Sequence, residues 1–147
     1  MRYSLILAGL LAAGAVQADN CTIELSGDDM MKFDKSSVTV SASCPQITLK
    51  LTHTGKLPAA SMGHNIVISP TAQYTAAAQD GMKAGLAADY VQAGDARVIA
   101  HTKIIGGGES TTATFPGSKL TAGEAYTFYC SFPGHWAIMK GDVVVVK

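Results

Sequence analysis

Three side chains that can bind a soft or borderline metal ion lie within one short stretch of the chain. Cys130, His135 and Met139 follow the spacing C-x4-H-x3-M. The pair Pro133-Gly134 is typical of a turn, which brings His135 back toward Cys130. Thiolate, imidazole and thioether are all ligands of transition metals, so we predict that this stretch is a metal-binding loop.

A second imidazole has to come from elsewhere in the chain. The best donor is His64, in Met62-Gly63-His64-Asn65, just ahead of an apolar run. Two histidines, one cysteine and a weak axial methionine form the ligand set of blue-copper electron-transfer sites. Zinc usually takes four firm ligands, so a set with one thiolate and one thioether suits it poorly. We therefore expect one copper ion bound by His64, Cys130, His135 and Met139.

Other interpretations of the same residues are open at this point. Cys130 alone fits a buried, inert cysteine. A thiol hydrolase would use Cys130 with a histidine, but it needs a substrate cleft and has no use for Met139 in the loop. A copper store favours exposed, exchangeable ligands, whereas these come from two separated parts of the chain. Four histidines in all are too few for a multi-copper enzyme.

The first residues have the pattern of a secretory signal peptide. Arg2 gives a positive start, residues 5–16 are uncharged and mostly apolar, and Val16-Gln17-Ala18 supplies small residues for cleavage. The apolar segment is too short to span a bilayer, which takes about 20 residues. We expect cleavage after Ala18, leaving residues 19–147 as one exported domain without a membrane anchor.

Charge and composition narrow the class of partner. The chain of 147 residues has 11 basic and 11 acidic side chains, which does not suggest binding to nucleic acid. A near-neutral surface gives little electrostatic steering, so we expect a partner to dock on an apolar patch.

The three cysteines of an exported chain leave one unpaired. Cys21 and Cys44 lie at the ends of a hairpin-sized segment, and an oxidising compartment favours their pairing in a disulfide. Cys130 is then the free thiol, and metal ligation would both protect and use it.

Most of the chain after residue 19 alternates apolar and polar residues with period two, which predicts strands. The alternation places His53 and His64 on inward faces. The final valine run predicts a strand covered on both faces, while an alanine-rich segment predicts a short helix inserted in a loop. The predicted strands include residues 37–43, 46–53, 64–68, 111–115, 126–132 and 142–147, and the predicted helix covers residues 73–82. Turn residues between these runs indicate an all-β, antiparallel Greek-key β-sandwich.

Four segments resemble a known family. They are Met62-Gly63-His64-Asn65, residues 97–103 with the glycines that follow, Phe128 to His135, and Met139-Lys140-Gly141. In these segments the chain closely resembles the azurins, small blue copper proteins with the cupredoxin fold, and the resemblance covers residues 21–147. It implies a periplasmic protein that is not an enzyme. Such a protein passes single electrons between redox partners, such as c-type cytochromes or a reductase, as a monomer.

The resemblance also implies roles around the ligands. The carbonyl of Gly63 would lie on the axial side opposite Met139, and Asn65 would tie the His64 segment to the Cys130 loop, with Phe132 beside the site. His135 would pass electrons through an apolar docking surface. That surface, called here the docking patch, would consist of Met31, Leu57, Met62, Phe132, Pro133, Gly134 and Ile138.

Several residues near the expected site are not assigned as ligands. His53 fits a hydrogen-bonded core histidine better than a ligand, although its azurin counterpart lies near the site and can respond to pH. Trp136 is expected to be partly exposed at the rim of the docking patch, with inward packing as the competing interpretation. Ile66 and Ser61 replace an aromatic and an apolar residue found in some azurins, while His101 receives no role.

Overall fold

A computed structural model describes residues 20–147, so the predicted signal peptide lies outside the described residues. The strands are β1 (Thr22–Gly27), β2 (Ser37–Ser41), β3 (Ile47–His53), β4 (Val67–Pro70), β5 (Ala100–His101), β6 (Ser110–Phe115), β7 (Ala125–Tyr129) and β8 (Lys140–Val146). The helices are α1 (Ala59–Met62) and α2 (Tyr74–Gly81), with 3₁₀ turns η1 (Met82–Ala84), η2 (Leu86–Ala88) and η3 (Gly117–Lys119).

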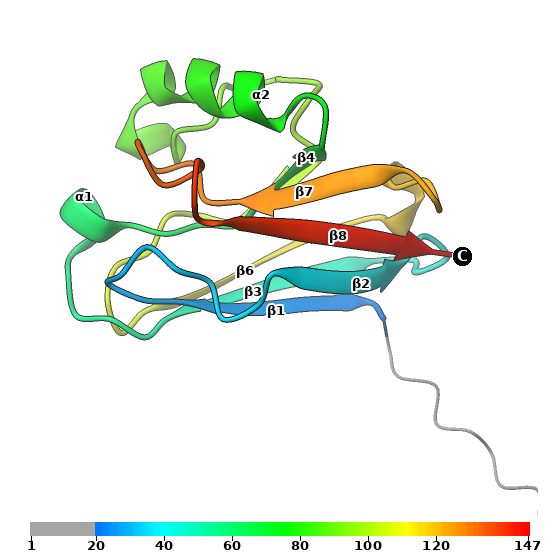
Figure 1. Cartoon of the computed structure of the whole chain (residues 1–147), viewed down its shortest axis with the longest axis horizontal. Helices are drawn as coiled ribbons and strands as arrows, with labels where there is room; N and C mark the ends of the chain where they lie inside the picture. The colour runs from blue at the N-terminus through cyan, green and yellow to red at the C-terminus, as the bar shows by residue number, and fades with distance from the viewer. Residues whose placement is uncertain (1–19) are drawn as a thin grey trace, which may run out of the picture.

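The strands form two sheets that pack face to face (Figure 1). One sheet has the order β1-β3-β6 and the other the order β2-β8-β7-β4-β5. The predicted β-sandwich is therefore confirmed. The expectation of purely antiparallel sheets is wrong, because β1 pairs with β3 in parallel and β2 pairs with β8 in parallel.

The alternation seen in the sequence produces the core between the sheets. In β3, Ile47, Leu49 and Leu51 are buried while the residues between them are more exposed. The last strand departs from our expectation: Val143 and Val145 are buried, but Val144 and Val146 are 47% and 37% exposed. The outer face of β8 is therefore uncovered, and a run of valines alone could not reveal that.

Helix α2 confirms the predicted inserted helix to within two residues at its ends. It lies over the outer face of the larger sheet near β4 and β7 (Figure 1). A second cluster of buried residues lies there, formed by Val67, Ala78, Val91 and Tyr129, with Tyr74, Val98 and Trp136 packed against it. We call this group the α2 cluster. It explains why four consecutive residues of β7, Tyr126 to Tyr129, are buried.

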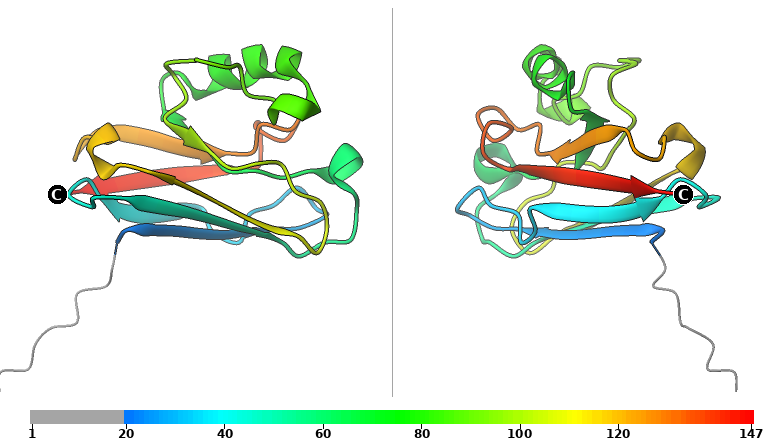
Figure 2. Two further views of the ribbon diagram at one scale, coloured as in Figure 1. Left: turned by 180° about the vertical axis from the view of Figure 1, so that it is seen from behind. Right: turned by 45° about the vertical axis from the view of Figure 1, so that its right-hand side comes forward.

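The two ends of the sandwich carry different features. The disulfide between Cys21 and Cys44, confirmed by the structure, ties the start of β1 to the β2–β3 connection. Figure 2 shows that α1 and the loop between β7 and β8 lie at the opposite end. Within residues 20–147, we find no helix with the length and apolar character needed to cross a membrane.

Candidate metal centre

His64, Cys130 and His135 meet in the interior at the α1 end of the sandwich. Their ligand atoms all lie within 4.8 Å of one another, and all three residues are buried. The Sγ of Cys130 is 3.9 Å from Nδ1 of His64 and 3.6 Å from Nδ1 of His135. Two imidazole nitrogens and one sulfur therefore converge, and no carboxylate or second thiol of residues 20–147 joins this group.

His64 is fixed by its backbone and by its ring. Its N–H and C=O groups pair with Ile105 in an isolated antiparallel bridge. We had expected His64 to be the first residue of a strand over residues 64–68, but β4 begins only at Val67. The ring Nε2–H of His64 donates to the carbonyl of Asp28 at 2.7 Å, which leaves Nδ1 to face the sulfur. Such a hydrogen bond sets the tautomer and the ring orientation of a ligand.

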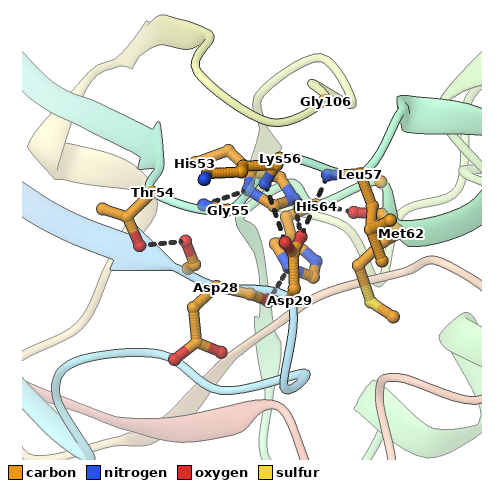
Figure 3. A network of polar contacts seen from close by, with 12 residues as sticks. Asp28, Asp29, His53, Thr54, Gly55, Lys56, Leu57, Met62, His64 and Gly106 are labelled. Carbon is orange, nitrogen blue, oxygen red and sulfur yellow. Dashed lines mark hydrogen bonds and ion pairs between the residues drawn. The ribbon is translucent and has the colours of Figure 1, made fainter.

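Behind His64 lies the ring of His53 (Figure 3). The two rings stack with centroids 4.3 Å apart and an interplanar angle of 14°. The N–H of Gly55 donates to Nδ1 of His53, so Nε2 carries the proton and donates to the carbonyl of Met62 at 2.8 Å. His53 is thus a core histidine with both ring nitrogens hydrogen-bonded, and its ring supports that of His64 from behind.

Cys130 follows β7 directly, and its N–H donates to the carbonyl of Met139 at 3.1 Å, which closes the loop. Burial raises the pKa of the thiol to about 12, although backbone N–H groups of Asn65 and Phe132 act in the opposite direction. Such a thiol holds its proton at neutral pH without a metal. Binding of a metal ion would release that proton.

Asn65 joins the two segments that carry ligands. Its Oδ1 accepts the N–H of Ser131 at 2.9 Å, and its Nδ2 donates to the hydroxyl of Ser131 at 2.8 Å. Both residues are buried, at 0% and 1% exposure. Because Asn65 follows His64 and Ser131 follows Cys130, this pair fixes the distance between the two ligands.

His135 is placed by a turn over residues 132–135. The N–H of His135 donates to the carbonyl of Phe132 at 2.9 Å, and Gly134 has φ of 84°. Proline followed by a glycine with positive φ is the signature of a type II turn. Burial lowers the pKa of His135 to about 4, so the ring is neutral at pH 7. Only 3% of the residue is exposed, which leaves at most an edge of the ring at the surface.

The other two expected ligands are Met139 and the carbonyl of Gly63, and glycines at positions 27 and 63 leave room for close packing around them. A Cβ on Gly27 would lie 2.8 Å from both Cε of Met139 and Cδ2 of His64, so a side chain there would fill the site. A Cβ on Gly63 would lie 2.5 Å from the carbonyl of Ala59 and 2.5 Å from Cγ2 of Ile104. The carbonyl of Gly63 itself is 3.7 Å from the sulfur.

These donors fit copper. Two neutral imidazoles and one thiol lie in a buried pocket with a thioether and a carbonyl beside them, and this is the donor set of a blue-copper site. The hydrogen bond from Nε2 of His64 to the carbonyl of Asp28 sets the orientation of that ring without a metal.

The docking patch has a mixed exposure. Leu57 and Ile138 are 43% and 63% exposed, and Pro133 and Gly134 are exposed as well. Met31, Met62 and Phe132 are half-buried. Sequence reasoning missed Met30, which is 74% exposed beside Met31 and has the largest exposure among the large hydrophobic residues described. Nothing in the sequence distinguishes Met30 from Met31.

Trp136 is half-buried and packs against the α2 cluster. These contacts agree better with inward packing than with a position at the rim of the docking patch. Sequence reasoning also missed Gly27 and Asp28, which lie against His64. Gly27 is the last residue of β1 and pairs with His53 at the end of β3, and such a register cannot be read from one strand alone.

The sandwich and its His–Cys–His cluster define a blue copper protein of the cupredoxin type. Comparison with known proteins agrees: residues 19–146 match the copper-binding proteins of the plastocyanin/azurin family. The chain is 56% identical over 123 residues to an azurin of Alcaligenes faecalis, covering 84% of this chain and 96% of that one. It is 49% identical over 148 residues to an azurin of Bordetella pertussis, covering 98% and 99%.

A solved structure of an azurin, Az-iso2 of Methylomonas sp. strain J, has the same fold, with a TM-score of 0.82 and 40% identity over 86% of this chain and 98% of that chain. The chain therefore belongs to the plastocyanin/azurin family. Its function is that of a blue copper electron-transfer protein with copper as cofactor, and it acts with redox partners rather than as an enzyme.

Proposed function

We propose that copper would be held by Nδ1 of His64, Sγ of Cys130 and Nδ1 of His135, with Met139 and the carbonyl of Gly63 as weaker ligands. The observation that carries this proposal is the convergence of the three ligand atoms within 4.8 Å in the interior. Copper bound there supplies a one-electron couple between Cu(II) and Cu(I).

The protein's part is to keep its ligands still. The bridge to Ile105, the hydrogen bond to Asp28 and the stacked ring of His53 all resist movement of His64. Ligands that need little rearrangement when the charge changes allow fast electron transfer. Burial of all three residues keeps water from the ligand atoms.

Electrons would enter and leave through His135. Its ring lies 4.6 Å from the ring of Phe132, centroid to centroid, in the same loop as exposed Pro133 and Ile138. Exposed apolar patches of this kind mark docking surfaces. We assign the docking patch to redox proteins such as c-type cytochromes or a periplasmic reductase. A patch of so few side chains suits a monomer that makes transient contacts.

The proposed compartment is the periplasm. Residues 1–18 would act as the signal peptide, and residues 19–147 would form the mature copper domain. The disulfide between Cys21 and Cys44 supports this proposal, because disulfides persist in oxidising compartments.

The test is the visible absorption of the protein after addition of Cu(II), beside a Cys130→Ser variant. We expect an intense sulfur-to-copper charge-transfer band that ascorbate bleaches and an oxidant restores, absent in the variant. Only a weak ligand-field band in the wild type would overturn the ligand assignment. Rapid loss of copper to a chelator would instead favour storage over electron transfer.

The predicted signal peptide is tested separately by expressing the full chain with its first 18 residues in a Gram-negative host. We expect periplasmic protein that begins at Asp19 by mass spectrometry. Full-length protein retained in the cytoplasm would contradict the proposed compartment.

A further inference from the structure

Asp89 and Tyr90, which follow η2, have an uncommon backbone conformation. Their φ values are 56° and 51°, in the left-handed region, which non-glycine residues seldom adopt. Aspartate tolerates this region better than most residues, because its short polar side chain can bond locally. Such conformations persist where surrounding contacts enforce them, often at functional sites. The contacts of Asp89 reach Asn65 and Ser131, which directly follow the expected ligands His64 and Cys130.

The main-chain carbonyl of Asp89 completes the hydrogen bonds of the Asn65–Ser131 pair. It accepts the hydroxyl hydrogen of Ser131 at 2.6 Å and the Nδ2–H of Asn65 at 3.3 Å. The other hydrogen of Asn65 Nδ2 goes to the Ser131 hydroxyl. Without this carbonyl, one hydrogen of Asn65 Nδ2 would lose its acceptor, and the hydroxyl of Ser131 would keep only Oδ1 of Asn65, at 3.1 Å.

The carboxylate of Asp89 holds the turn in place from the other side. Its Oδ1 accepts the N–H of Ile104 at 2.8 Å. Ile104 precedes Ile105, which forms the bridge with His64, and its side chain packs over Gly63. One residue thus contacts both the segment that flanks His64 and the segment that follows Cys130.

We propose that Asp89 is a positioning residue for the copper site: its left-handed turn aims a carbonyl at Asn65 and Ser131, and so fixes the backbone N–H groups that face the sulfur of Cys130. The proposal rests on Cys130 being the copper ligand, as proposed above. Neither role of Asp89 involves gain or loss of a proton.

Loss of the contact between the Asp89 carbonyl and the Asn65–Ser131 pair should lower the reduction potential of the copper. The N–H groups of Asn65 and Phe132 act on the sulfur of Cys130. Hydrogen bonds around a metal ligand tune the electronic properties of the metal. If these groups are held less firmly, the thiolate donates more charge, which favours Cu(II) and lowers the reduction potential.

The experiment compares four proteins: wild type, Asp89→Ala, Asp89→Asn and Asp95→Ala. Asparagine keeps the tolerance for positive φ and an Oδ1 acceptor for Ile104, whereas alanine keeps neither. Asp95 is the matched control: its carboxylate is buried and accepts the N–H and guanidinium of Arg97, and no hydrogen bond or ion pair within residues 20–147 joins it to a ligand segment. Each protein is measured for its reduction potential, its visible spectrum and, without metal, the amide hydrogen exchange of Ser131.

For Asp89→Ala we expect about a tenfold shift toward Cu(II), which is about 59 mV for one electron, and faster exchange of the Ser131 amide. Asp89→Asn should restore the wild-type values, and Asp95→Ala should lose stability without moving the potential. An unchanged potential in Asp89→Ala, or an equal shift in Asp95→Ala, would overturn the proposal.

A further variant covers the case in which Asp89→Ala does not fold. Asp89→Gly keeps the left-handed conformation accessible and removes only the carboxylate. We expect a smaller shift in the same direction, and a wild-type potential would count against the proposal. The failure of the ligand assignment would look different, because the wild type itself would then lack the intense band.

Discussion

His64 and His135 face the same sulfur but are held in opposite ways. His64 is fixed by a bridge to Ile105, by a ring hydrogen bond to Asp28 and by the stacked ring of His53. His135 belongs to a short loop, where a type II turn and the ring of Phe132 are its main supports. The imidazole of His64 is fixed by the body of the sandwich, whereas that of His135 belongs to a loop at its end.

The difference separates two requirements of electron transfer. A fixed geometry keeps the ligands from rearranging, and that is the contribution of the His64 side. Contact with a partner needs a ligand near the surface, and His135 lies in the loop with exposed Pro133 and Ile138. We therefore expect crowding behind His64 to disturb the site more than changes in the loop around His135.

The largest effect should come from Gly27→Ala. The added Cβ would lie 2.8 Å from the methyl of Met139, which can shift, and 2.8 Å from the ring of His64, which is held by Asp28 and His53. We expect a loss of about 1–3 kcal/mol in the free energy of unfolding, typical of overpacking, together with a shifted or weakened blue band. Denaturant unfolding and visible absorption measure the two effects.

The control for Gly27→Ala is Gly117→Ala at the disulfide end. A Cβ there would clash with the carbonyl of Cys44, so it overpacks the backbone far from the ligands. Unfolding should again become easier, but the blue band should be that of the wild type. If Gly27→Ala also leaves the band unchanged, the His64 side is not the rigid half of the site.

The difference between the two sides also separates what the sequence predicts from what it cannot. The His135 side is local: Cys130, Pro133, Gly134, His135 and Met139 lie in one loop, so spacing and turn chemistry place them together. The inserted helix was an equally local pattern, and it is confirmed. The disulfide, which is also confirmed, followed from the cysteine count of an exported chain rather than from local spacing.

The His64 side depends on strand register and on contacts between distant segments. Asp28 lies 36 residues from His64, and Asn65 lies 24 residues from Asp89, so no spacing rule connects them. The parallel pairing of β2 with β8 was missed for the same reason, because alternation shows which face is buried but not which strand is the neighbour. The left-handed turn at Asp89 leaves no mark in the sequence either.

A moderate effect is expected from Gly134→Ala on the His135 side. Gly134 has φ of 84°, and a Cβ there would meet nothing within 4 Å, so the cost is backbone strain without crowding. Left-handed backbone costs a non-glycine residue about 1–2 kcal/mol. Gly123→Ala is the matched control, with φ of 86°, equally open space and no ligand nearby.

Both variants should lose a similar free energy of unfolding in denaturant, because the strain is the same. Only Gly134→Ala should also weaken copper retention against a chelator, since its turn carries His135. A blue band disturbed more by Gly134→Ala than by Gly27→Ala would reverse our ranking of the two sides.

The smallest effect should come from Trp136→Phe, directly after His135. The indole Nε1 of Trp136 is buried without a hydrogen-bond partner among the described residues, and such a group costs about 1–3 kcal/mol to desolvate. Phenylalanine gives up some contact with the α2 cluster but removes that cost, so the change in unfolding free energy should stay within about 1 kcal/mol. Tyr129→Phe in the same cluster is the comparison, because its hydroxyl is bonded to Ser69 at 3.3 Å. If Trp136→Phe destabilises the protein more than Tyr129→Phe, then packing of the indole supports the His135 loop, and the two histidines are held more equally than their contacts indicate.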